Sequence, residues 1–488
     1  MAPIICRIVN LSLERATFPQ AYTSAIVKPL IKKPTLDKEF KNYRPVSNLP
    51  FVGKLIEEVV SQQINSHLTE NHLLEPLQSA YKAKHSTETA LIAVFNDILC
   101  ELDRPDTGVL LGLLDMSAAF DTVNHTILLK RLEHTFGVTA KALSWFRSYF
   151  QDRNVSVVIG NAVSDPLTID CSLPQGSKIG PRSYSDYTQP LGNLLRILII
   201  IYHCYADDSQ LMKTMSLKSD LLQQKSVDHL SKCIKEIEQW TFDNKLKLNP
   251  SKTEFLILCS KTNRHKVAVS ELTLQDSTIL ESHCAKNLGV WIDQNVTMEK
   301  HVNEICKVCL FYINWIRKIR PCLTVDITKS IVQALVISRI DYCNALLYAL
   351  PSFLIYKIQR VMNIAARLIF RAPRDASITD LMKKLHWLKV EDRVKFKILC
   401  LTWKSLQNQT PEYISDMLDV NASTRNLRSS STLNLYVPRT RTRFGDRSFK
   451  HAAPKLWNSL PIGIRNQQNF VSFKRALKTY LFKNAYKC

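Results

Sequence analysis

Short apolar runs alternate with stripes of apolar residues at helical spacing over roughly the first 300 positions of the chain. A run of four to eight apolar residues predicts a strand buried on both faces, whereas apolar residues at every third or fourth position predict one face of a helix. Strands are predicted at 25–31, 109–114, 155–159, 197–202, 209–212, 255–258 and 288–292. Helical stripes follow Ile56, Val60, Ile64 and Leu68, then a segment that begins near Ser86, and then Val227, Leu230, Ile234, Ile237 and Trp240.

Between these segments the chain carries turn signals. Asn42-Tyr43-Arg44-Pro45 predicts a turn, because the residue before proline is disfavoured in helical geometry. Leu173–Gly176 predicts a second turn, and Asp207 and Asp208 fall at the tip of a predicted hairpin.

Beyond residue 300 the pattern becomes helical. One predicted face contains Ile327, Ile331, Ala334, Leu335 and Ser338; a second contains Ile358, Met362, Ala365 and Ile369; a last helix covers Phe473–Phe482. The order of elements predicts an α+β catalytic body followed by a helical, basic carboxyl-terminal end.

The amino-acid composition indicates which kind of partner the protein binds. The 488 residues exceed what one core usually supports, so two or three packed units are expected. The net charge of +22 favours a polyanionic partner such as nucleic acid, with basic composition alone as the alternative. After Asn421 the only acid is Asp446, among basic residues at 425, 428, 439, 441, 443, 447, 450 and 455. The aromatic residues there, Tyr436, Phe444, Phe449 and Trp457, favour a nucleic-acid surface over a merely solvated basic face.

Several classes of protein are disfavoured. The thirteen cysteines show no disulfide framework, and the one C-x-x-C, Cys306 and Cys309, lies in a helical pattern without a second pair. Arg7 interrupts the apolar amino terminus, so no signal peptide is predicted. No apolar run approaches the roughly 20 residues that span a bilayer. The expected setting is intracellular, with reduced thiols and no membrane partner.

Two predicted buried strands end in aspartate, at Leu114-Asp115 and at Tyr205-Ala206-Asp207-Asp208. Alone, an Asp-Asp pair is as well explained by a solvated turn. Three carboxylates brought together repel one another and are costly to bury unless a cation compensates them. Magnesium prefers such oxygen ligands together with substrate phosphates, and two ions about 4 Å apart suit phosphoryl transfer. The pattern therefore predicts a two-magnesium site, with Mn²⁺ as a possible substitute.

These residues also carry a family resemblance. The Tyr205–Asp208 segment resembles the catalytic box of reverse transcriptases. Further segments resemble boxes of LINE-type (non-LTR) retrotransposon enzymes: Leu114–Val123, Leu173–Ser177, Gln78–Lys82 with His85–Thr87, Asn244–Asn249 with Lys252–Glu254, Asn287–Val290, Ser338–Asn344 and Ala453–Asn458. The resemblance covers nearly the whole chain.

The resemblance implies a right-hand polymerase fold, with fingers at 1–108, palm at 109–300, a helical thumb at 301–400 and a basic carboxyl-terminal region at 401–488. It implies that RNA is copied into DNA from dNTPs on a DNA primer or target. Three aspartates would hold the metal, namely Asp115, Asp207 and Asp208. The other implied site residues are Lys252 as general acid, Phe120 as a gate against the ribose 2′-hydroxyl, Lys32, Arg44, Gln175 and Gly176 around the nucleotide, and Lys82, Tyr205, Leu288 and Gly289 around template and primer.

Some features depart from the family pattern. Arg182, Ser183 and Asp186 stand where bulky apolar residues are usual, which puts the packing of that helix in question. The endonuclease of complete elements is expected but is not seen in this chain, so the chain is expected to be part of a larger reading frame. Action in nucleus and cytoplasm is expected. The alternative function is a polymerase-fold remnant that binds nucleic acid without catalysis.

Overall fold

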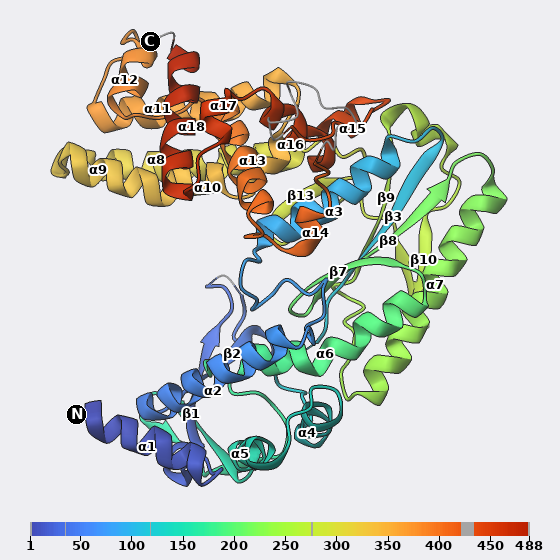
Figure 1. Cartoon of the computed structure of the whole chain (residues 1–488), viewed down its shortest axis with the longest axis vertical. Helices are drawn as coiled ribbons and strands as arrows, with labels where there is room; N and C mark the ends of the chain where they lie inside the picture. Colours follow the sequence, from blue (N-terminus) through green and yellow to red (C-terminus); the bar gives the residue numbers. More distant parts are fainter. Residues whose placement is uncertain (1, 35, 118, 275–276, 421–433, 487–488) are drawn as a thin grey trace. The chain divides into compact units, whose positions relative to one another are not determined.

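The computed structural model describes residues 2–34, 36–117, 119–274, 277–420 and 434–486 (Figure 1). The chain forms two compact units, each assembled from several segments. Unit 1 contains Met1–Tyr81, Leu114–Ser209 and Ser231–Thr253, and unit 2 contains Lys82–Leu113, Gln210–Leu230 and Glu254–Cys488. The division into fingers, palm, thumb and carboxyl-terminal region is a functional one and stays a prediction.

Unit 1 is a mixture of helices and short strands. Its elements are α1 (Ala2–Glu14), β1 (Ser24–Ile31), β2 (Tyr43–Asn48), α2 (Phe51–Glu70), α4 (His125–His134), α5 (Ala140–Phe150), β4 (Arg153–Ile159), β5 (Ala162–Val163), β6 (Leu167–Ile169), α6 (Gly180–Ile197) and β7 (Ile201–Tyr205). The stripe from Ile56 to Leu68 is buried in α2, as predicted.

A mixed sheet of order β2-β1-β4-β5, with β6 also on β4, organises the amino-terminal part of unit 1. The turn predicted at Asn42–Pro45 is wrong, because Tyr43–Asn48 is a strand antiparallel to β1. Proline is compatible with this strand since β2 lies at the sheet edge, where a missing N–H removes no ladder bond on the open side. The extended geometry before proline suits a strand as well as a turn.

The strand predicted at 197–202 is displaced along the chain. Helix α6 continues to Ile197, and β7 begins only at Ile201. Ile197 and Ile199 are 76% and 81% exposed, so this apolar run is not a buried strand in its first half. A short apolar run cannot by itself distinguish a strand from the end of a helix.

Three elements contain residues of both units: β3 (Thr107–Leu114), β8 (Asp208–Ser216) and α7 (Asp220–Asp243). The palm-like sheet has the order β7-β8-β3-β9, with β3 at Thr107–Leu114 and β9 at Glu254–Leu258. Strands β3 and β9 are antiparallel, with Val109 opposite Leu258. The predicted strands at 109–114, 209–212 and 255–258 and the helix at 227–240 are therefore confirmed.

Unit 2 contains the remaining elements and is largely helical. They are α3 (Thr87–Leu102), the hairpins β10 (Glu271–Leu274) with β11 (Ser277–Leu280) and β12 (Cys284–Asn287) with β13 (Val290–Asp293), and the helices α8 (Glu299–Ile319), α9 (Val325–Val332), a π-helical turn (Gln333–Ile337), α10 (Ser338–Asp341), α11 (Ser352–Phe370), α12 (Ile378–Lys384), α13 (Val390–Leu406), α14 (Glu412–Ser415), α15 (Arg443–Arg447), α16 (Phe449–Asn458), α17 (Ile462–Arg465) and α18 (Phe470–Tyr486).

Helices α8 and α11 pack against each other in the main core of unit 2. The predicted face of α11 is buried, from Ile358 to Ile369. The face predicted from Ile327 to Ser338 is wrong, because Val332, Val336 and Ile340 are buried and Ile327 is 49% exposed. Apolar residues occur on both sides of this segment, and the π-helical turn shifts the register after Val332.

The carboxyl-terminal helices pack within unit 2, where α14, α15 and α16 contact α3. The Asp103 carboxylate, just after α3, accepts hydrogen bonds from the backbone N–H groups of Arg441 and Thr442. Two of the four aromatic residues of the stacking surface predicted for this region, Trp457 and Phe449, are buried in the core, whereas Tyr436 is 50% exposed.

Arg447, one of the predicted surface cations, is also enclosed. It donates to the carbonyl of Val296, and burial lowers the pKa of its guanidinium to about 10. Arg425 and Arg428 lie outside the described residues. Among the residues that the structure describes, no helix combines the length and the apolar character needed to cross a bilayer.

Candidate active site

Asp115 is held at the end of β3 by backbone pairing with the segment that follows α7. The Asn249 N–H donates to the Asp115 carbonyl at 2.9 Å, and Met116 forms an antiparallel bridge with Leu248. The Ser117 N–H donates to the Lys247 carbonyl at 2.8 Å. The Asn244–Asn249 motif thus has a structural reason, since it supplies the backbone that fixes the first aspartate.

The second and third aspartates follow a tight turn that a buried glutamine supports. Ala206 has a left-handed φ of 55° and connects β7 to the aspartates. The Gln78 side chain, 5% exposed, accepts from the Ala206 N–H at 2.8 Å and donates to the Ala206 carbonyl at 3.2 Å. Gln78 therefore satisfies both backbone groups of the strained residue immediately before Asp207.

The charge of Asp115 reaches both of the other carboxylates. Burial raises the pKa of Asp207, and the charge of Asp115 adds to that rise. Desolvation by surrounding atoms, followed by the charges of Asp207 and Asp115, raises the pKa of Asp208 to about 6, although Asp208 still presents part of its surface to solvent. Like charges gathered at one place disfavour full ionisation, and a bound cation is the usual compensation.

The donor set fits a divalent metal chemically, because it consists of carboxylate oxygens from two strands. The side chains as they stand do not yet converge as ligands do: within the described residues, no group of three or more His, Cys, Asp or Glu side chains is already placed to hold a metal ion. A cationic amine occupies part of this region, because Lys252 Nζ donates to Asp115 Oδ2 at 2.8 Å. The positive charge of Lys252 acts to lower the pKa of Asp207 and of Asp208, and so partly opposes the rise caused by burial.

Phe120 stacks on a tyrosine that the sequence did not single out. The rings of Phe120 and Tyr184 lie 5.0 Å apart with an interplanar angle of 18°. Tyr184 is fully buried in α6, and its hydroxyl donates to the sulfur of Met116 at 3.2 Å. The stack holds the Phe120 ring against α6.

The predicted nucleotide residues form a polar group in unit 1. Gln175 Nε2 donates weakly to Asp121 Oδ1, at 3.4 Å, and the charge of Lys32 also acts to lower the pKa of Asp121, which burial raises. The Ser47 N–H of β2 donates to the Gln175 carbonyl at 3.2 Å.

The next residue, Gly176, is suited to this turn. It has a φ of 103°, and a Cβ there would lie 3.2 Å from the Ser47 carbonyl oxygen, so a larger residue would be strained. From β2, the charge of Arg44 acts to lower the pKa of Asp207. Tyr205 is the last residue of β7.

The polar residues that depart from the family pattern in α6 form a buried ion pair. Arg182 Nε donates to Asp186 Oδ1 at 2.8 Å, one helical turn apart, and the two side chains are 7% and 2% exposed. Burial raises the pKa of Asp186, and Arg182 opposes that effect. The packing of α6 is thereby preserved, because each buried charge has its partner on the same helix.

The other predicted template and primer residues lie in unit 2. Lys82 precedes α3, whereas Leu288 and Gly289 form the turn of the β12–β13 hairpin. Both turn residues have positive φ, 44° and 87°, which is the geometry of a two-residue hairpin turn. Tyr342 covers this turn, because its hydroxyl donates to the Leu288 carbonyl at 2.7 Å. The strand predicted to begin at Leu288 therefore begins at Val290.

Sequence reasoning missed Gln78 and Tyr184 as individual site residues. The sequence did mark Gln78 as the first residue of the Gln78–Lys82 motif. Its partner could not be predicted, because the Ala206 backbone lies 128 residues further along the chain. Tyr184 had no signal in the sequence, since an aromatic residue in an amphipathic helix usually indicates core packing.

An aspartate that follows one strand, beside two aspartates at the turn between the neighbouring strands β7 and β8, is the arrangement expected of a nucleic-acid polymerase. Comparison with known proteins makes this specific. The model of the family described as "Reverse transcriptase (RNA-dependent DNA polymerase)" matches residues 31–292, and the chain belongs to this family. The α+β, right-hand polymerase fold expected from the motifs is confirmed.

Curated relatives of this chain are also RNA-directed DNA polymerases. A probable RNA-directed DNA polymerase from transposon BS of Drosophila melanogaster is 25% identical over 397 residues, which cover 79% of this chain and 42% of the relative. The RNA-directed DNA polymerase from mobile element jockey of Drosophila funebris is 23% identical over 396 residues, with 80% and 42% covered. The resemblance to LINE-type enzymes is thereby confirmed, and the chain spans less than half the length of these curated relatives.

A solved structure of apo telomerase from Candida tropicalis aligns with 79% of this chain and 66% of its own, at 10% identity and a TM-score of 0.40. That likeness is too remote to inform the site. As a class, reverse transcriptases are nucleotidyltransferases that act on a template and a primer with divalent metal ions.

Proposed function

We propose that this chain catalyses RNA-directed DNA synthesis, in which a primer 3′-hydroxyl attacks a dNTP and pyrophosphate leaves. The observation that carries the proposal is the placement of the carboxylates: the segment after α7 fixes Asp115 at the end of β3, where its charge acts to raise the pKa of both Asp207 and Asp208. Three acidic groups in range of one another have a strong reason to bind cations.

Asp115, Asp207 and Asp208 would hold two magnesium ions, for which Mn²⁺ is a substitute. When bound, these ions would activate the attacking hydroxyl and neutralise charge on the departing pyrophosphate. Lys252 Nζ, a donor 2.8 Å from Asp115 Oδ2, would supply a proton to the leaving group. Arg44 and Lys32 would bind the triphosphate, with Gln175 and Gly176 lining the pocket.

We propose that the stacked Phe120 ring selects deoxynucleotides by occupying the space that a 2′-hydroxyl needs. Its support is the contact with Tyr184, which restricts where the ring can move. Lys82, Tyr205, Leu288 and Gly289 would contact template and primer. By analogy with the relatives, the substrates would be element RNA and nicked chromosomal DNA, and the enzyme would act in the nucleus after synthesis in the cytoplasm. An endonuclease of the same element would supply the nick.

Primer extension on poly(rA)/oligo(dT) with dTTP and magnesium tests the proposal. Wild-type protein should extend the primer, and Asp207→Ala should not. Asp165→Asn is the matched control, because it removes an exposed carboxylate of the same unit that belongs to none of the motifs and should leave extension intact. The alternative, a remnant that only binds nucleic acid, predicts template binding without extension and no difference between wild type and Asp207→Ala.

A further inference from the structure

A deep hollow in unit 2 is lined by an unusual number of arginines. It has a volume of about 1050 Å³ and lies where the carboxyl-terminal ends of α8 and α11 meet the loop before α12. Its arginines are Arg317, Arg320, Arg360, Arg367, Arg371 and Arg374. No Asp or Glu belongs to the lining, so the cations face one another without a neutralising group in the hollow.

Arg320 and Arg371 hold backbone carbonyls, and Arg317 donates to Asn314 Oδ1 at 2.9 Å on its own helix. Arg320 is buried and donates to the carbonyls of Leu368 and Ile369, at the end of α11. Arg371 donates to the carbonyl of Arg320 at 2.8 Å. These three hydrogen bonds tie the end of α8 to the end of α11, so this part of the hollow is a defined part of the fold.

The remaining cations are available to an anion. Arg360 and Arg374 are exposed, and Arg367 Nε is buried with no hydrogen-bond partner among the described residues. A buried guanidinium nitrogen without an acceptor costs free energy that an oxygen ligand would recover. Guanidinium groups bind phosphate oxygens through paired, planar hydrogen bonds, so the chemistry fits phosphate best.

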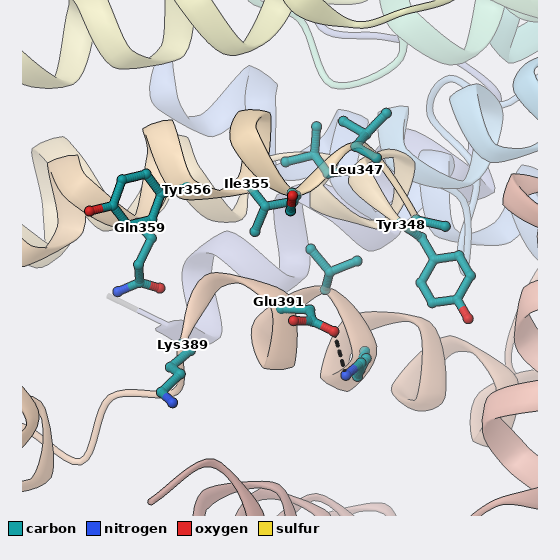
Figure 2. Close-up of a pocket in the computed structure, with 12 residues that line it drawn as sticks. Leu347, Tyr348, Ile355, Tyr356, Gln359, Lys389 and Glu391 are labelled. Carbon is teal, nitrogen blue, oxygen red and sulfur yellow. Dashed lines mark ion pairs between the residues drawn. The ribbon is translucent and has the colours of Figure 1, made fainter.

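An exposed aromatic ring at the edge of the hollow extends the site. Tyr356 of α11 lines the arginine hollow and also a second, neighbouring hollow of about 470 Å³, and it is 62% exposed. Gln359 and Lys389 also line the second hollow, and Figure 2 shows Gln359 pointing from α11 toward Lys389 at the start of α13, with the Tyr356 ring alongside α11. Phosphate-binding arginines beside an open aromatic ring are the combination that holds an unpaired nucleic-acid strand.

We propose that these two hollows form one groove that binds a single-stranded nucleic acid, with phosphates on the arginines and a base stacked on Tyr356. The groove lies wholly within unit 2, and none of its residues belongs to the candidate active site. The inference therefore goes beyond polymerase activity and does not require it. RNA and DNA strands share the recognised chemistry, and the test separates them.

The test measures fluorescence anisotropy of labelled oligo(rU) or oligo(dT) of about twelve nucleotides, within the known range of single-strand sites. Full-length protein is used without magnesium and with a saturating unlabelled template–primer hairpin, which occupies the polymerase site. The labelled strand should still bind. If the hairpin abolishes its binding, no second site exists and the proposal fails.

Variants then locate the site. Tyr356→Ala should weaken binding by roughly 5- to 150-fold, the loss of one stacked base, whereas Tyr356→Phe should retain it. The Arg360→Gln/Arg374→Gln double variant should reduce the slope of log K against log salt by about 1.4, which is about 0.7 for each lost contact to a single strand. Lys318→Gln/Lys384→Gln removes the same charge from exposed positions outside the lining and serves as the control.

The outcomes are distinct. Equal effects of the arginine and lysine pairs would mean general charge attraction and would overturn the proposal. So would a duplex that competes as well as the single strand and is insensitive to Tyr356→Ala. Preference for oligo(rU) over oligo(dT) identifies RNA, and equal affinity identifies backbone recognition; both support the groove. Primer extension is measured separately, so an inactive polymerase with a functional groove is recognised as such.

Discussion

The buried ion pair in α6 gives a prediction whose size follows from its surroundings. Arg182 and Asp186 are 7% and 2% exposed, so Arg182→Met would leave an unpaired carboxylate inside unit 1. Removing one partner of such a pair costs about 3–5 kcal/mol, whereas replacing both by apolar residues is often neutral. Arg182→Met should therefore destabilise α6 strongly, and Arg182→Met/Asp186→Leu should restore most of the loss.

Native-state hydrogen exchange of α6 peptides measures this directly. Because about 1.4 kcal/mol corresponds to a factor of ten, the single variant should exchange roughly 100- to 5000-fold faster than wild type. Exchange within threefold of wild type in the single variant would refute the reasoning, as would a double variant as labile as the single one.

The effect should also depend on pH. Burial raises the folded-state pKa of Asp186 above its usual value, and loss of Arg182 removes the opposing effect. A carboxyl with a raised folded-state pKa favours the folded state below its unfolded pKa and loses that contribution as pH rises through the folded pKa. The defect of Arg182→Met relative to wild type should thus be smaller near pH 5 than near pH 8.

Three further predictions concern the site. Phe120→Ala should admit ribonucleotides while the fold is kept, as read from the ratio of rNTP to dNTP incorporation; unchanged discrimination would contradict the gate. Gln78→Leu should leave the turn before the aspartates without its two hydrogen bonds, at a cost of about 1–3 kcal/mol for each buried group, and lower extension in a primer assay more than global stability in a thermal melt. Gly289→Ala should destabilise the β12–β13 hairpin, since φ is 87° and its Cβ would lie 3.3 Å from the ring of Tyr342; a wild-type melting temperature and wild-type extension would show that the turn tolerates the change.

How far the sequence predicts this protein depends on whether the signal is local. The stripe of α2, the strand β3 before Asp115, the strand β8 and the buried face of α11 follow from period and composition, which act over a few residues. The strand predicted at 197–202 was wrong in its first half, because a short apolar run suits the end of a helix as well as a strand. The partner of Gln78 could not be predicted, because it depends on how distant segments of the chain come together.

Two of the four aromatic residues predicted to form a stacking surface near the carboxyl terminus, Trp457 and Phe449, are buried for a related reason. Aromatic residues between basic ones suit both a nucleic-acid surface and a helix that buries one face, and Trp457 shows that the second applies. The sequence did not indicate the arginine hollow either, because its six arginines come from two separate stretches of the chain, 317–320 and 360–374.

The attachment of α15 and α16 to α3 has a consequence for how the protein is made. Helix α3 leaves the ribosome some 340 residues before Thr442, whose N–H binds the Asp103 carboxylate with a sequence separation of 339. During synthesis, the face of α3 that these late helices cover stays exposed until they have been made. By then all the candidate catalytic residues have already left the ribosome. A gene copy with an early stop codon after those motifs would therefore yield a chain with intact aspartates and an uncovered apolar helix, which chaperones and proteases recognise.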